Sequence, residues 1–304
     1  MIHISGGVLR MGSSEFYAEE GPVHERVVEP FMLDAHPVTN AQFAEFIQAT
    51  RYVTVAEQEL DPTDFPGADP RDLVPGALVF TGTVGPVDLN DWRQWWRWQP
   101  GARWNEPSGR GSTVDDISEH PVVQVSFHDA SAYAAWAGKR LPTEAEWEWA
   151  ARGRLTGARF AWGDEQNPHG EILANTWQGA FPYRNAGAAG WRGTSPVGSF
   201  PPNGYGLVDM IGNVWEWTSD FYAPRHSLPG QVPLDAGTRT NLLAARSAEP
   251  GSRTPRRVLK GGSHLCAPEY CLRYRPAARS AQAEDTAMTH IGFRCARDAT
   301  GAAL

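Results

Sequence analysis

The chain has 304 residues, enough for one large domain or two small ones, and its 41% hydrophobic and 20% charged residues are typical of globular proteins. The net charge of −8 argues against general binding to nucleic acid or to anionic membranes. No apolar run is long enough to span a bilayer, and the N-terminus lacks a signal-peptide pattern. We therefore expect a cytoplasmic protein that binds neither nucleic acid nor a membrane. The 31 glycines, 24 prolines and 13 tryptophans predict ordered loops held by aromatic rings rather than long helices.

The first fifty residues predict two strands and a helix. Residues 6–12 alternate apolar and other side chains between glycines, and residues 27–34 are typical of a second strand. A helix is expected to begin at Thr39, whose hydroxyl can cap the first turn while Gln42 returns the bond in a capping box. Phe43, Phe46 and Ile47 fall on one face, which predicts packing against the core.

The segment 59–119 is the least regular part of the sequence. Seven prolines interrupt it, and five tryptophans crowd into thirteen positions: Trp92, Trp95, Trp96, Trp98 and Trp104. One interpretation is an aromatic groove for a peptide or a sugar, because loop tryptophans provide contact area at low entropic cost. The other is an insertion that buries itself with these rings, and this is the commoner use of a large aromatic side chain.

A short strand is expected over residues 121–126, leading directly into a helix. Ser126 and Asp129 can cap that helix, and Gly138 can end it. An apolar stripe on the helix would comprise Tyr133, Trp136 and Ala137.

A third helix is expected to follow at once. Thr143 and Glu146 form its capping box, and Gly153 is the stop. Glu144, Glu146 and Glu148 could be a catalytic carboxylate cluster, but favourable negative charge near a helix N-terminus explains them better.

Two of the three cysteines, Cys266 and Cys271, lie in a segment rich in glycines and cations. Five residues of spacing leave open a disulfide, a metal clamp, a nucleophile with a resolving thiol, or two inert core residues. A zinc site needs four ligands and no second paired set exists, whereas two soft thiolates suit copper(I). Nearby cations would favour thiolates: Lys260, His264, Arg273 and Arg275.

Four segments resemble the sulfatase-modifying-factor family, whose founding members are formylglycine-generating enzymes. They are residues 138–148, 212–217, 261–263 and 292–294, in matching order, and the resemblance runs from about Gly6 to Arg297. It implies that residues 1–304 form a single domain of the family's fold. That fold is mixed α/β (α+β), low in regular secondary structure and distantly similar to C-type lectins.

The cysteine segment resembles the aerobic formylglycine-generating enzymes most specifically. Their Gly-Gly-Ser-x-x-Cys-x4-Cys-x-Arg-x-Arg pattern is present at residues 261–275. The resemblance implies oxidation of the cysteine in a Cys-x-Pro-x-Arg motif of an unfolded sulfatase polypeptide to Cα-formylglycine, with dioxygen as co-substrate. Copper(I) would be held by Cys266 and Cys271 and would accept the substrate thiolate as a third ligand. Ser263 and Tyr270 would orient ligands or the oxygen species, and Trp215 would wall the oxygen pocket.

Structural calcium is also implied by the resemblance, at two sites. The first would use the Asn175 side chain and the carbonyl groups of Thr176, Ala189 and Trp191; some relatives have aspartate where Ala189 stands. The second would use Asp209, Glu216 and the carbonyl groups of Gly212 and Val214. Closely spaced hard oxygen ligands suit calcium, although an acidic surface turn could give the same pattern.

The third cysteine, Cys295, has no counterpart for the disulfide found in secretory relatives, so we expect a buried free thiol. We expect a monomer. The alternative to an oxidase is a lectin-like, calcium-stabilised binding module of the same fold in which Cys266 and Cys271 form a disulfide. A third hypothesis keeps the oxidase but replaces copper by a sulfenic acid at a thiol.

Overall fold

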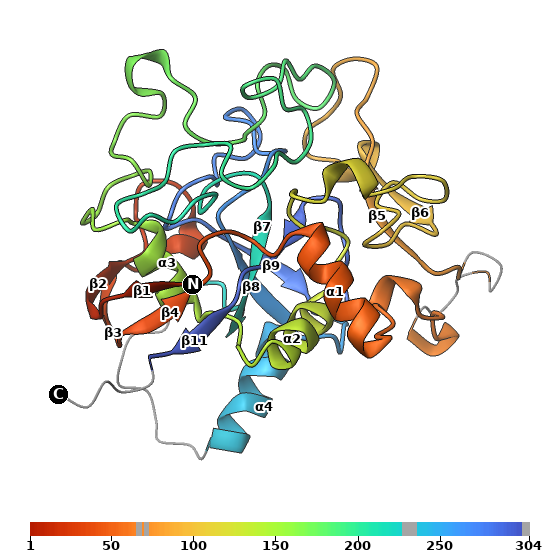
Figure 1. Ribbon diagram of the computed structural model, residues 1–304, viewed down its shortest axis with the longest axis horizontal. Coiled ribbons are helices and arrows are strands. Elements are labelled where there is room, and N and C mark those ends of the chain that lie inside the picture. The colour runs from red at the N-terminus through yellow and green to blue at the C-terminus, as the bar shows by residue number, and fades with distance from the viewer. Residues whose placement is uncertain (65–68, 70–72, 227–235, 300–304) are drawn as a thin grey trace.

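A computed structural model describes residues 1–64, 69, 73–226 and 236–299. Its centre is a sheet with the strand order β10-β7-β8-β9, visible in the middle of Figure 1. The strands are β7 (Trp215–Phe221), β8 (Arg256–Lys260), β9 (Arg279–Ala283) and β10 (Ile291–Gly292). β10 pairs with β7 in parallel, and the other pairs are antiparallel.

Smaller sheets surround this centre. β1 (Ile2–Ile4), β4 (Phe31–Leu33) and β11 (Ala296–Asp298) form an antiparallel sheet that joins the two ends of the described chain. Two ribbons complete the set, β2 (Gly7–Met11) with β3 (His24–Val28), and β5 (Gly76–Phe80) with β6 (Trp96–Pro100). The strand predicted at residues 6–12 is confirmed, whereas β5 and β6 lie inside the segment expected to be irregular.

The strand predicted over residues 27–34 is wrong as a single element. β3 ends at Val28 and β4 begins at Phe31, and the two belong to different sheets. Pro30 lies between them and has no amide hydrogen to donate to a ladder. The strand predicted over residues 121–126 is also wrong: Gln124 has a φ of 59°, outside the extended region, and only an isolated bridge between Thr39 and Pro121 is present there.

The helices are α1 (Asn40–Thr50), α2 (Phe127–Trp136), α3 (Glu144–Ala151) and α4 (Ala236–Ser247). Short 3₁₀ turns lie at Ala18–Glu20, Val55–Glu57, Pro62–Asp64, Trp92–Gln94, Asp115–Ile117 and Pro168–Gly170. None of the helices in the described ranges is long and apolar enough to cross a membrane. Mixed α/β architecture with little regular secondary structure, as predicted, is therefore confirmed.

The capping boxes predicted at Thr39 and Thr143 are present, and the cap predicted at Ser126 is a capping box as well. Phe43 and Phe46 of α1 are buried and Ile47 packs against the same core. α1 and α2 lie side by side in Figure 1. The stripe predicted on α2 is right at Tyr133, and Ala137 is partly buried against the core. Trp136 is 43% exposed and contacts the rings of Phe46 and Tyr133.

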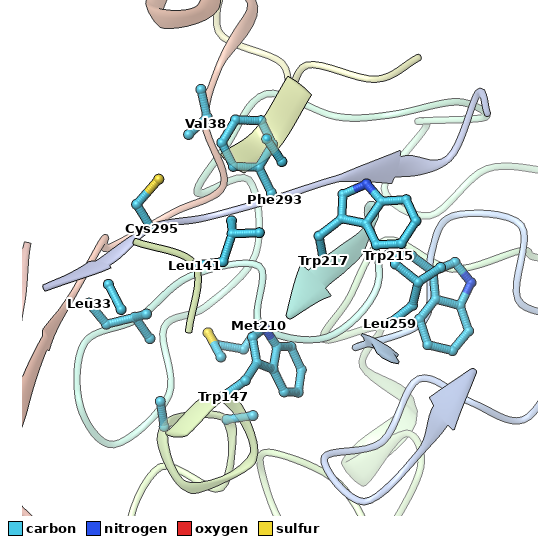
Figure 2. Packing of buried hydrophobic residues seen from close by; sticks show 14 of the residues in the cluster. Leu33, Val38, Leu141, Trp147, Met210, Trp215, Trp217, Leu259, Phe293 and Cys295 are labelled. Atoms are coloured by element: carbon cyan, nitrogen blue, oxygen red, sulfur yellow. The ribbon is translucent and has the colours of Figure 1, made fainter. Parts of the chain in front are cut away.

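Part of the main core lies between α3 and the central sheet. Figure 2 shows Trp215 and Trp217 side by side on β7, as side chains two apart on a strand should be. Trp147 of α3 is fully buried and its indole nitrogen donates to Glu216 at 2.8 Å. Truncating a buried ring of this size to alanine costs about 3–5 kcal/mol. The core thus fixes α3 against the strands that lead to the cysteine segment.

The glutamates of α3 do more than favour its N-terminus, which corrects the prediction for two of them. Glu144 and Glu148 are buried and point toward β8 and β9: Glu144 binds Arg279 at 2.8 Å, and Glu148 binds Arg152 at 2.7 Å and Lys260 at 3.1 Å. Although burial opposes ionisation, Lys260 and Arg152 lower the pKa of Glu148 to about 2. These pairs are structural and lie apart from the cysteines.

Candidate active site

The site is built on the loop that follows β8. Gly261 and Gly262 have φ angles of 96° and 70°, and a Cβ at Gly262 would come within 2.9 Å of the Tyr274 backbone. The glycines therefore allow the chain to turn back on itself. Two tight turns follow, in which the amide of Cys266 donates to the Ser263 carbonyl and that of Cys271 to the Ala267 carbonyl.

These turns bring the two cysteines together. Their Sγ atoms lie 3.0 Å apart, and the residues are 2% and 8% exposed. Both are free thiols, so the structure does not contain the disulfide that a purely structural module would use. The amide of Ser263 also donates to the sulfur of Cys266 at 3.4 Å.

The two thiols differ in acidity. Burial raises the pKa of Cys266 well above its ordinary value. The hydrogen bond from Cys266 and, to a smaller extent, Arg273 together lower the pKa of Cys271 to about 7 against the effect of burial. Cys271 therefore carries the negative charge of the pair near neutral pH.

Only one of the four cations predicted to favour thiolates does so. Arg273 acts on Cys271 and is itself held by Glu19 at 2.7 Å. Lys260 is bound to the α3 glutamates, and Arg275 forms a buried pair with Glu20. Burial lowers the pKa of His264 to about 4, and its ring bonds the Asn213 carbonyl at 2.8 Å, so it adds no charge at neutral pH.

The cysteines lie in the wall of a cavity of about 440 Å³. Predicted residues Ser263, Tyr270 and Trp215 line the same cavity, as do Trp92, Trp95, Trp96, Phe181, Arg273 and His290. Tyr270 stacks on Phe181 with ring centroids 4.5 Å apart, and Trp95 meets it edge-on at 5.3 Å. The structure thus brings together the two cysteines and all three companions predicted from the sequence.

The five crowded tryptophans divide between the two interpretations. Trp95 and Trp104 are buried, in agreement with self-burial of the segment. Trp92, Trp95 and Trp96 nevertheless line the cavity, as an aromatic groove would require. Trp98 is exposed and donates to the Val74 carbonyl at 3.1 Å.

His290 is among the cavity residues that were not predicted. His290 lies 3.2 Å from the Ser263 hydroxyl through Nδ1, and the edge of Trp96 packs on its ring at 4.8 Å. It precedes β10, and no local sequence pattern connects that strand with the cysteine segment. A lone histidine 27 residues from Ser263 carries no spacing signal, so only the fold could reveal the contact.

The first predicted calcium set lies where two loops meet. Asn175 is buried, its side-chain nitrogen donates to the Gly193 carbonyl at 2.9 Å, and its Oδ1 has no hydrogen-bond partner. Ala189 has a φ of 48° in the turn that closes between Ala188 and Trp191. A buried carbonyl oxygen without a partner is what a bound cation would satisfy.

The second predicted calcium set is already occupied by protein donors. Arg294 and Trp147 both donate to the Glu216 carboxylate at 2.8 Å, and Gly198 donates to Asp209 at 2.6 Å. Burial raises the pKa of Asp209 to about 6. Because Arg294 neutralises Glu216, this set has less need of a cation than the first and fits calcium less well.

The third cysteine lies away from the cavity. Cys295 is fully buried and free, as predicted, and its amide donates to Asp34 at 3.2 Å.

Among residues 1–64, 69, 73–226 and 236–299, no group of three or more His, Cys, Asp and Glu side chains could hold a metal ion.

Comparison with known proteins connects this geometry to a family. A family model described as the sulfatase-modifying factor enzyme 1-like domain matches residues 1–299. The chain is 61% identical over 298 residues to a protein of Mycobacterium tuberculosis named formylglycine-generating enzyme, covering 98% of this chain and 97% of the relative. It is 45% identical over 302 residues to a protein of the same name from Thermomonospora curvata, covering 98% and 93%.

A solved structure shares the fold. PvdO from Pseudomonas aeruginosa superimposes with a TM-score of 0.62 at 24% identity, covering 98% of this chain and 93% of that one. At this identity the likeness concerns the fold alone, whereas the sequence matches cover the cysteine loop and nearly every other described residue. The chain therefore belongs to the sulfatase-modifying-factor family, that of the formylglycine-generating enzymes.

Proposed function

We propose that this protein is a formylglycine-generating enzyme that oxidises the cysteine of a Cys-x-Pro-x-Arg segment in an unfolded sulfatase. The names of the two bacterial relatives support the reaction. The observation that carries it is the pair of free thiols, Cys266 and Cys271, 3.0 Å apart in the wall of an aromatic cavity. A cavity of about 440 Å³ accepts a few residues of an extended peptide, not a folded domain.

The reaction needs an external reductant to balance. Dioxygen takes four electrons and four protons: two of each come from the substrate as its Cβ–H and S–H hydrogens are lost, and two of each come from two added thiol groups, which form a disulfide. Two waters and a thioaldehyde result, and hydrolysis of the thioaldehyde releases hydrogen sulfide and leaves the aldehyde. The protein must therefore hold the substrate sulfur, admit dioxygen and restrict bulk water until this step is complete.

The donor set suits copper(I), which would supply the electron transfer to dioxygen that a thiol alone does slowly. Cys271 would bind it most readily as a thiolate, because its pKa of about 7 leaves roughly half of this thiol ionised at neutral pH. The second ligand would be Cys266, whose Sγ lies 3.0 Å from that of Cys271.

The neighbouring side chains provide a fixed surface for the substrate. Burial raises the pKa of Tyr270 to about 12, so its hydroxyl stays protonated and can donate to an anionic group. Its ring is held between Phe181 and Trp95, and Trp215 closes the cavity near the sulfurs. Such packed rings keep water out and orient ligands without reorganising during the reaction.

Calcium at the first set is part of the proposal. Asn175 would provide Oδ1, the buried oxygen that has no partner, and the carbonyl groups of Thr176, Ala189 and Trp191 would complete the protein ligands. Calcium at the second set, on Asp209 and Glu216, remains a prediction. A calcium ion there would have to compete with Arg294 for the carboxylate of Glu216.

The proposal is tested with a synthetic Cys-x-Pro-x-Arg peptide, incubated aerobically with the protein, copper and a thiol reductant. Cys271→Ser and Cys266→Ser should each abolish formation of the aldehyde, detected by mass spectrometry. Cys295→Ser is the matched control, because this third buried thiol lies outside the cavity and should leave turnover near normal. Substantial turnover in either of the first two variants would overturn the role of the thiol pair.

A further inference from the structure

Ser263 lies three residues before Cys266, and its hydrogen bonds restrict what its hydroxyl can do. Its oxygen accepts from the amide of Leu265 at 3.2 Å and lies 3.2 Å from Nδ1 of His290. Ser263 is fully buried and lines the cavity. The direction of its single proton therefore depends on the tautomer of His290.

The two neutral tautomers of His290 give the Ser263 hydroxyl opposite roles toward a ligand in the cavity. If Nδ1 carries the hydrogen, His290 donates to Ser263, the serine oxygen accepts twice, and the hydroxyl proton is free to point into the cavity. If Nε2 carries it, Nδ1 accepts the serine proton, and Ser263 can then only accept from a cavity ligand. An anionic ligand, such as a thiolate or reduced oxygen, requires a donor.

We propose that His290 is a positioning residue that holds the Nδ1–H tautomer, donates to Ser263 and so directs the serine hydroxyl toward an anionic group bound beside Cys266. This inference rests on the proposed function for the identity of that group. His290 itself is held in place, since its carbonyl accepts the amide of Trp215 at 2.8 Å and Trp96 packs edge-on against its ring.

The imidazole is suited to this task because it stays neutral. Burial lowers the pKa of His290 to about 3, and neighbouring His264 acts in the same direction. His290 therefore keeps one N–H and one free nitrogen across the neutral range. A neutral donor to the oxygen of Ser263 also increases the acidity of the serine hydroxyl, which strengthens the bond that the hydroxyl gives.

The tautomer can be measured without turnover. Long-range ¹H–¹⁵N correlation of histidine-labelled protein, with His290 assigned by His290→Asn, should show Nδ1 as the pyrrole-type nitrogen and Nε2 as the pyridine-type nitrogen. The reverse assignment in the wild-type protein overturns the proposal. In Ser263→Ala the preference for Nδ1–H should decrease, because its acceptor is gone.

Kinetics on the Cys-x-Pro-x-Arg peptide provide the second readout. Removing one preorganised donor from an active site costs on the order of 10²–10³ in kcat, and an indirect donor less, so His290→Leu should lower kcat about tenfold to hundredfold with little change in KM. His290→Asn can place an amide N–H near the position of Nδ1 and should restore most of the rate. In a Ser263→Ala background, His290→Leu should have almost no further effect.

A large additional loss in that background would mean that His290 acts independently of Ser263, and it would overturn the inference. Failure of the wild-type protein to convert the peptide would contradict the proposed function instead, and the tautomer measurement would still decide the hydrogen-bond direction. Thermal unfolding of every variant establishes that the fold is retained.

Discussion

Replacing Arg273 by glutamine should raise the pKa of Cys271 and expose how the site makes its thiolate. Arg273 is the one cation acting on this thiol among the four that the sequence suggested. Opposite charge near an ionisable group typically lowers its pKa by about 1–3 units. Because the larger effect, the hydrogen bond from Cys266, remains in the variant, we expect the lower end of that range.

The size of the effect follows from the starting value. With a pKa of about 7, roughly half of Cys271 is thiolate at neutral pH. A rise of about one unit, equivalent to ~1.4 kcal/mol, leaves roughly one tenth as thiolate. The thiolate fraction thus falls about fivefold. With an alkylating agent in excess at neutral pH, the rate of Cys271 modification should fall by about the same factor.

The assay is a pH titration of thiolate ultraviolet absorbance in the metal-free protein, with Cys271→Ser as the blank. Arg297→Gln serves as a control because this arginine is exposed and remote from the cavity. An Arg273→Gln titration curve that coincides with that of the wild type would refute the electrostatic reasoning. It would leave the Cys266 hydrogen bond as the sole cause of the low pKa.

Three further results are expected. Lys260→Met should lower the free energy of unfolding in urea by about 3–5 kcal/mol, because it leaves buried carboxylates unpaired, whereas Arg159→Gln on the surface should cost less than about 1 kcal/mol. Folding lowers the pKa of His264 to about 4, so the unfolded protein binds more protons at this residue than the folded protein does. The free energy of unfolding should therefore fall as pH drops from about 6.5 toward 4, by about 2 kcal/mol at pH 5. The stability advantage of the wild type over His264→Gln should shrink over the same pH range. Asn175→Leu should remove the calcium-dependent rise in melting temperature that wild type and the exposed control Asn90→Ala show; an undiminished rise in the leucine variant places calcium elsewhere.

Local signals in the sequence were sufficient for α1, α2 and α3, whereas α4 was not predicted. Each capping box joins a hydroxyl to a side chain three residues later, so Thr39, Ser126 and Thr143 could be assigned without knowledge of the fold. Glycine positions at the cysteine loop were equally readable. Strand boundaries were not, because Pro30 divides one apolar run between two sheets and Gln124 adopts a positive φ that its neighbours do not suggest.

The contacts that complete the site were beyond local signals. Lys260 pairs with Glu148, which lies 112 positions away in the chain. The sequence therefore could not show that this cation binds a glutamate of α3 and not the cysteines. His290 reaches Ser263 only because β10 pairs with β7, which places the residue before β10 against the start of β7. The motif around Cys266 and Cys271 predicted these two as the reacting groups, and the fold determines which neighbours lie against them.

The most direct test of the account is conversion of a Cys-x-Pro-x-Arg peptide under air, with a thiol reductant, by protein supplied with one equivalent of copper(I) and by protein kept under a copper chelator. The account predicts an aldehyde at the cysteine, detected by mass spectrometry, in the first sample and little in the second. Absence of the aldehyde in both samples, with Cys266 and Cys271 shown to be reduced and the protein folded, would contradict the proposed activity. Equal conversion in both would preserve the activity and remove copper from it.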